Sequence, residues 1–171
     1  MDKKVAIVGA GTSGLVACRY VLGKGYSPTV FEALDSVGGV WAETMETTTL
    51  QTPKVFYQFS DFPWPNSVTT LYPSKQEVVD YLHSYAVRFD LLGRIKFNSK
   101  VVSLRYEGGA SEEEIQAWSF WGGTGEPFAS KGKWRLTVED TVSHSIKVCS
   151  CCSEMLTDIT NRYINIQNLR V

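Results

Sequence analysis

A short apolar run followed by closely spaced glycines is the feature that most restricts what this chain can fold into. The run Val5–Val8 ends at Gly9, and Gly11 and Gly14 complete the pattern G-x-G-x-x-G. A continuous run of this length predicts a buried strand, and the glycines predict a tight turn after it. Chance alone produces such a pattern in roughly one of ten chains with this glycine content, so its surroundings decide its interpretation.

Those surroundings predict a complete strand–helix–strand unit. Residues 12–22 carry apolar positions near helical spacing, and Gly23 and Gly25 supply a stop signal. Ser27 to Phe31 then forms a second β-prone run. A crossover of this kind normally joins parallel strands. We therefore expect an α/β fold with a Rossmann-like domain.

The chemistry of this unit favours a bound dinucleotide. Gly9 permits the tight turn, Gly11 leaves room for a pyrophosphate beside the backbone, and Gly14 lets helix and strand pack closely. The helix N-terminus offers free N–H groups and the positive end of its dipole. Glu32 ends the second strand, where a carboxylate accepts hydrogen bonds from ribose hydroxyls and repels a 2′-phosphate. This argues against NADP in this first site.

A second glycine pair follows soon afterwards. Gly38 and Gly39 would let another backbone segment approach the dinucleotide, and Trp41 would form a wall of the pocket. The alternative is a surface turn followed by a core tryptophan. Taken alone, the pair favours that alternative, because Gly-Gly is common in turns.

The rest of the chain predicts a long loop, one helix and several short strands. Residues 44–73 have no clear period, and a loop of this length is usually functional. Ser74 and Glu77 form a capping box that opens a helix running to about Phe89, with Gly93 as its terminator. The remaining β-like stretches are Ile95–Phe97, Val101–Tyr106, Trp134–Val138 and Ser145–Val148. The last two look like a hairpin, and we expect a small antiparallel β-meander beside the parallel sheet.

Composition excludes several classes of partner. The 171 residues carry a net charge of -1 without a basic run, so we expect no nucleic acid or anionic membrane partner. No stretch approaches the ~20 apolar residues that span a bilayer, so we expect a soluble, cytoplasmic protein. Cys149, Cys151 and Cys152 lie near His144, but their spacing fits no zinc pattern, so we expect no metal.

Three segments together resemble the flavin-containing monooxygenases, especially the plant branch. They read VAIVGAGTSGL, VFEALDSVGGVW and YQFSDFPWP, and the resemblance covers residues 4–148 in order. It implies a partial, Rossmann-like FAD-binding domain over residues 1–148. Residues 149–171 would be a non-family tail, poorly ordered or weakly helical over Ser153–Ile166. Such a tail is typical of an altered reading frame or a retained intron.

The resemblance also implies a function. Members of this family bind FAD, use NADPH to reduce it, and pass one oxygen atom of O₂ to a soft nitrogen or sulfur nucleophile. Gln51 stands where many members carry an asparagine near the flavin, so it is the one candidate for a flavin-proximal residue; the catalytic residues are otherwise unassigned. The residues that the resemblance assigns to the cofactor are Gly9, Ala10, Gly11, Thr12, Ser13, Gly14, Glu32, Gly38, Gly39, Val40 and Trp41.

The chain lacks two other motifs of that family. The sequence contains neither a second glycine-rich motif for NADPH nor the F-x-G-x-x-x-H sequence that precedes it. We therefore expect an N-terminal fragment that is inactive alone and carries little or no flavin when purified. One alternative is a non-catalytic dinucleotide-binding remnant. A small NAD-dependent reductase is weaker, because His83 is expected on a helix surface and Tyr81 and Tyr85 are expected to be packing groups. The sequence does not indicate an oligomeric state.

Overall fold

The computed structural model describes residues 4–107, 113, 133–152 and 154–157. It contains a parallel sheet of order β3-β2-β1-β7 and an antiparallel meander of order β4-β5-β6. The strands are β1 (Lys4–Val8), β2 (Ser27–Phe31), β3 (Ile95–Lys96), β4 (Ser99–Glu107), β5 (Lys133–Asp140), β6 (Ile146–Cys152) and β7 (Glu154–Thr157). The helices are α1 (Thr12–Gly23), α2 (Val40–Glu43), α3 (Lys75–Arg88) and the short 3₁₀ turns η1 (Lys54–Phe56) and η2 (Leu92–Arg94).

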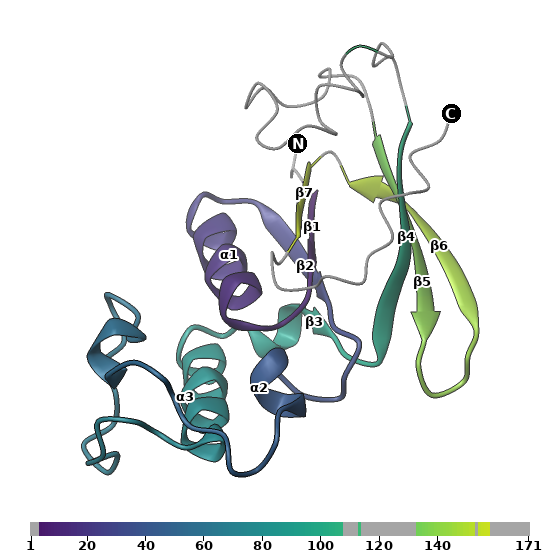
Figure 1. Ribbon diagram of the computed structural model, residues 1–171. Coiled ribbons are helices and arrows are strands. Elements are labelled where there is room, and N and C mark those ends of the chain that lie inside the picture. The colour runs from purple at the N-terminus through teal and green to yellow at the C-terminus, as the bar shows by residue number, and fades with distance from the viewer. Residues whose placement is uncertain (1–3, 108–112, 114–132, 153, 158–171) are drawn as a thin grey trace.

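The parallel sheet lies between the helices and the meander, as Figure 1 shows. Val5 and Ile7 of β1 belong to the core that includes α1 and α3. Ala6 and Val8 point to the other face and join the core of the meander. Because both faces of β1 are covered, its sequence is a continuous apolar run rather than an alternating one. The expected α/β class and the antiparallel meander are confirmed.

The β7 strand corrects the expectation for the last part of the chain. Residues 154–157 form neither a weak helix nor a poorly ordered tail, but pair in parallel with β1, with Val8 opposite Thr157. The free edge of β1 supplies the hydrogen-bonding partners, which outweigh the low strand propensity of so short a segment. Residues 158–171 lie outside the described part of the chain, and the division at residue 148 stays a prediction.

The two long helices end in the same way but with different residues. After α1, Gly25 takes the left-handed conformation at φ 80°, as the stop signal predicted. After α3, Asp90 rather than Gly93 takes it, at φ 52°. Asp90 N–H donates to the Val87 carbonyl, and Leu91 N–H donates to that of Ala86. This is a Schellman ending, and the prediction of Gly93 as terminator is wrong.

Two further sequence predictions concern single residues. Cys18 is fully buried in α1, as expected of a core cysteine, and burial raises the pKa of its thiol to about 11. His83 is exposed on α3, as expected. Within the described residues, no helix is both long and apolar enough to cross a bilayer.

Candidate functional site

The glycine-rich turn between β1 and α1 has the geometry that its sequence predicted. Gly9 adopts φ 92°, and its N–H donates to the Phe31 carbonyl at 2.8 Å, which ties the turn to β2. A Cβ atom on Gly14 would lie 1.9 Å from the carbonyl oxygen of Gly9. The third glycine of the motif is therefore required for the close approach of α1 to β1.

The N-terminus of α1 has no side-chain cap among the described residues. Gly11 is its N-cap residue and has no side chain to accept a hydrogen bond, and Leu15 N–H makes the first bond of the helix, to the Gly11 carbonyl. Ser13 is exposed in the first turn. An uncapped start leaves backbone N–H groups available to an external acceptor, and the helix dipole favours a negative one.

The second glycine pair lies against this turn. Gly38 N–H donates to the Ala10 carbonyl at 3.1 Å. A Cβ atom on Gly39 would lie 2.9 Å from the Cα of Gly11, and Gly39 has φ 56°. The two glycine segments are thus in backbone contact, which only residues without side chains permit.

Val40 and Trp41 are the first two residues of the short helix α2, which the sequence did not predict. Val40 is exposed and Trp41 is half-buried. Trp41 packs against the core from its edge rather than inside it. Trp41 is thus neither fully buried nor fully exposed, and its role as a wall of the pocket stays a prediction.

Glu32, the residue directly after β2, supports the same turn. The residue is 5% exposed, and its Oε2 accepts from Ala10 N–H at 2.5 Å. Its Oε1 accepts from Leu34 N–H at 2.9 Å. The backbone of Glu32 is fixed as well, since its N–H donates to Lys96 and its carbonyl accepts from Ser99. A carboxylate has about four acceptor positions, so positions remain for a ligand's hydroxyl groups.

Tyr57 belongs to the site and was missed by sequence reasoning. Its hydroxyl shares a 2.8 Å hydrogen bond with Oγ1 of Thr12, the first residue of α1. Its ring meets that of Trp41 edge-on, with centroids 6.0 Å apart. No local sequence signal marks this tyrosine, because the contact depends on how the loop 44–73 folds back over α1.

An aromatic cluster holds that loop in place. The Trp64 ring stacks on Tyr81 of α3 at 4.0 Å, and its Nε1 donates to the Lys54 carbonyl at 2.9 Å. The Tyr81 hydroxyl accepts from Phe59 N–H at 2.9 Å and donates to the Phe62 carbonyl at 2.5 Å. Burial raises the pKa of Tyr81. Tyr81 is thus a packing group, as expected, and it also fixes two backbone groups of the loop.

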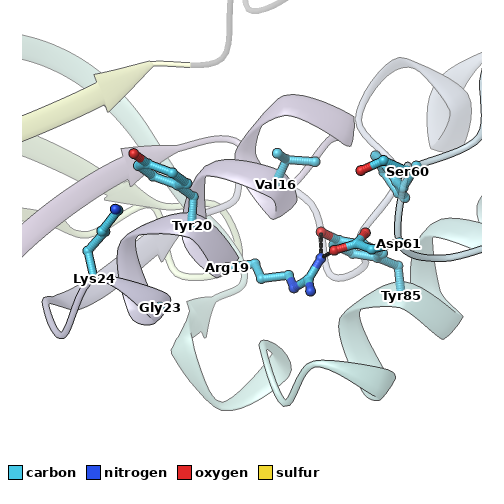
Figure 2. A pocket seen from close by; sticks show the side chains of 9 residues that line it. Val16, Arg19, Tyr20, Gly23, Lys24, Ser60, Asp61 and Tyr85 are labelled. Atoms are coloured by element: carbon cyan, nitrogen blue, oxygen red, sulfur yellow. Dashed lines mark hydrogen bonds and ion pairs between the residues drawn. The ribbon is translucent and has the colours of Figure 1, made fainter.

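A charged contact joins the loop to α1. Arg19 reaches from α1 to the Asp61 carboxylate and donates to the Tyr85 hydroxyl at 3.4 Å, as Figure 2 shows. Its guanidinium also lies 3.6 Å from the centre of the Phe89 ring. Arg19, Asp61 and Tyr85 border a cavity of about 460 Å³ along α1, which neither Glu32 nor the glycine segments line. The cavity is therefore separate from the glycine-rich site.

Among the described residues, no hydrogen bond or ring contact joins Gln51 to the glycine segments. Its side chain is exposed, and its Nε2 donates to the Thr49 carbonyl at 3.4 Å. Its neighbour Leu50 is buried and bonded to Pro73, which fixes the backbone at this point. The role of Gln51 beside a flavin stays a prediction.

The family model and the curated relatives indicate one family. The family model described as flavin-binding monooxygenase-like matches residues 2–120. A probable flavin-containing monooxygenase 1 of Arabidopsis thaliana is 42% identical over 166 residues, covering 92% of this chain and 30% of the relative. Flavin-containing monooxygenase 2 of Homo sapiens is 30% identical and covers 88% of this chain and 28% of the relative.

Solved structures share the fold at low sequence identity. The S-allyl-L-cysteine S-oxygenase of Allium sativum superimposes with a TM-score of 0.69 at 18% identity, covering 92% of this chain and 36% of that one. An oxidised steroid monooxygenase bound to NADP gives a TM-score of 0.62 at 22% identity, covering 92% and 26%.

The similarity is continuous over most of the chain. A match to 92% of 171 residues reaches beyond residue 148, where the motif-based resemblance stopped. The chain spans about a third of the length of the curated plant relatives it matches, 30% and 34%. On the family model and these relatives, the chain belongs to the flavin-binding monooxygenase-like family.

Proposed function

We propose that this chain is the FAD-binding portion of an NADPH-using monooxygenase that oxygenates soft nitrogen or sulfur nucleophiles. The observation that carries the proposal is the uncapped start of α1. The second glycine segment touches it, and the buried Glu32 carboxylate is bonded to the same turn. The name of one structural neighbour, an S-oxygenase, supports a sulfur nucleophile as one class of substrate.

The residues fit the adenine half of FAD. The backbone N–H groups at the start of α1 would bind the pyrophosphate, and the close contact of Gly39 with the Gly11 Cα would hold the second glycine segment beside it. The free acceptor positions of Glu32 would bind the ribose hydroxyls. The segment of Gly38, Gly39, Val40 and Trp41 would line the path towards the flavin ring.

FAD, when bound, supplies the redox and oxygen chemistry. The part of this chain is to orient the cofactor and to keep water away from one side of it. The half-buried Trp41 ring and the Tyr57 ring packed on it form an apolar wall suited to that task. No residue of this chain is assigned to NADPH, so we expect cofactor binding without turnover.

A binding experiment tests the proposal. The purified chain is titrated with FAD while the quenching of flavin fluorescence is recorded. We expect saturable binding that is weak enough for the chain to lose its flavin during purification. The variant Gly11→Val should abolish binding, because its side chain occupies the phosphate position. The control Gly23→Ala lies in the same helix, with open space around it, and should bind like the wild type.

The second candidate is a non-catalytic dinucleotide-binding remnant, because the glycine segments and the buried Glu32 account for dinucleotide binding without chemistry. Both candidates bind FAD, so turnover separates them. NADPH oxidation by the FAD-loaded chain would support a self-sufficient enzyme, whereas its absence together with binding would support a part that needs more protein. Oxidation of NADH without bound flavin would instead favour a small reductase.

A further inference from the structure

We propose that Tyr57 positions Thr12 for FAD and is therefore a cofactor-positioning residue of this site. The inference deepens the proposed function and rests on it. Tyr57 comes from the loop 44–73, outside the two glycine segments, and it is the described residue of that loop that hydrogen-bonds to the start of α1.

The first step of the argument is the place of Thr12. Thr12 is the first residue of α1, where the helix N–H groups have no side-chain cap. A hydroxyl at this position lies beside any anion bound there, and it can donate one hydrogen bond and accept two. Which way its hydrogen points decides whether it assists that anion.

The second step is the partner of Thr12. The Tyr57 hydroxyl lies 2.8 Å from Thr12 Oγ1. When Tyr57 donates its hydrogen to Thr12, the Thr12 hydroxyl is left to donate its own hydrogen to a phosphate oxygen. Hydrogen bonds arranged in such a chain strengthen one another. Tyr57 thereby orients a donor before the ligand arrives, which lowers the cost of ordering it on binding.

The third step is the rigidity of Tyr57 itself. Tyr57 follows η1 directly, and its N–H donates to the Lys54 carbonyl at 3.0 Å. The same carbonyl accepts from Trp64, whose ring is stacked on Tyr81 of α3. The Tyr57 ring also meets Trp41. The loop is thus built on α3 and delivers one hydroxyl to α1.

The test compares FAD binding to the purified 171-residue chain and to three variants. Tyr57→Phe removes the hydroxyl and keeps the ring, and we expect FAD to bind about three- to tenfold more weakly, the range for one neutral hydrogen bond. Thr12→Val should weaken binding at least as much. Tyr72→Phe is the matched control, an exposed tyrosine of the same loop, and should bind FAD like the wild type.

The double variant separates positioning from a structural role. If Tyr57 acts through Thr12, the variant Tyr57→Phe/Thr12→Val binds FAD no more weakly than Thr12→Val alone. The rise in melting temperature on adding FAD should fall in Tyr57→Phe, while the melting temperature without FAD stays near that of the wild type. The inference would be overturned if the two single losses of FAD affinity multiplied in the double variant. It would also be overturned if Tyr57→Phe lowered only the melting temperature without FAD.

Three outcomes distinguish this inference from the proposed function. A wild-type chain that binds no FAD at millimolar concentration overturns both. Wild-type binding that survives Gly11→Val overturns the site. Wild-type binding that is lost in Gly11→Val but unchanged in Tyr57→Phe overturns only the inference about Tyr57.

Discussion

The helices α1 and α3 begin in opposite ways. In α3, Ser74 and Glu77 satisfy each other's backbone donors in a complete capping box. In α1, the N-cap is Gly11, and no described side chain takes its place. Both helices are similarly long and pack in the same core. A helix that needs only to be stable caps itself, whereas α1 leaves its N-terminus open beside the glycine turns and Glu32.

The largest expected effect concerns the close approach of α1 to β1. In Gly14→Ala, the new Cβ atom would meet the Gly9 carbonyl at 1.9 Å, so α1 must move away. We expect a loss of about 3 kcal/mol in the free energy of unfolding, measured with denaturant. Gly23→Ala has nothing within 4 Å and should be neutral or stabilising by up to ~1 kcal/mol. Equal stabilities for the two variants would contradict the packing at Gly14.

The next effect concerns the hydrogen bonds of the Glu32 carboxylate, which hold the turn before α1. Glu32→Gln places an amide N–H against one of two backbone donors, that of Ala10 or that of Leu34. We expect a loss of about 2 kcal/mol in the free energy of unfolding, because one buried donor loses its acceptor. The control Asp35→Asn changes an exposed carboxylate nearby and should alter stability little. If Glu32→Gln has the stability of the wild type, the hydrogen bonds of the Glu32 carboxylate do not stabilise the turn.

Removing the cap of α3 should separate stability from binding. Ser74→Ala deletes the acceptor for Glu77 N–H, and we expect a loss of about 1 kcal/mol in the free energy of unfolding. The affinity for FAD at α1 should not change, since α3 caps itself for its own stability. A parallel loss of FAD affinity, after correction for the unfolded fraction, would contradict the contrast between the two helices.

The smallest effect concerns the turn between β5 and β6, which also caps itself. Asp140 Oδ1 accepts from Ser143 N–H at 2.8 Å and from Val142 N–H at 3.1 Å. The bond from the Ser143 backbone is the main reason why the pKa of Asp140 lies below its ordinary value of 3.8. The ionised Asp140 carboxylate therefore stabilises the turn at pH values above 3.8, and this stabilisation is lost as the pH falls through the lowered pKa.

NMR titration of the Asp140 side chain, with amide exchange of Ser143 as a second probe, measures this effect. Asp140→Asn should remove the pH dependence of the turn while leaving the glycine-rich site unchanged. A midpoint at or above the ordinary value for aspartate would show that the turn does not prefer the ionised carboxylate.

Local features of this fold were predictable from the sequence, and distant contacts were not. The strands β1 and β2 and the capping box of α3 lie where the sequence placed them, because each depends on neighbours within a few residues. The strand β7 was missed, because four residues carry little propensity and depend on the free edge of β1.

In the candidate site too, local features were easier to predict than distant contacts. Glycine permits the close contact of the two segments, since side chains would prevent it, but the Gly38–Gly39 pair taken alone favoured a surface turn. The hydrogen bond between Glu32 and Ala10 N–H could not be predicted, because an acid after a strand is equally suited to a ribose. The bond between Tyr57 and Thr12 depends on the folding of the intervening loop, for which the sequence has no periodic signal.

The position of β7 has a consequence for the order in which the chain assembles. Strand β1 lies between β2, which follows it almost at once, and β7, whose residues leave the ribosome more than a hundred positions later. The β1–α1–β2 unit can therefore form early, through short-range contacts. The other flank of β1 must wait, with its backbone groups unpaired, until the meander is synthesised. During that interval the nascent chain exposes a strand edge that other chains can pair with, so synthesis rate and chaperone access will govern its yield.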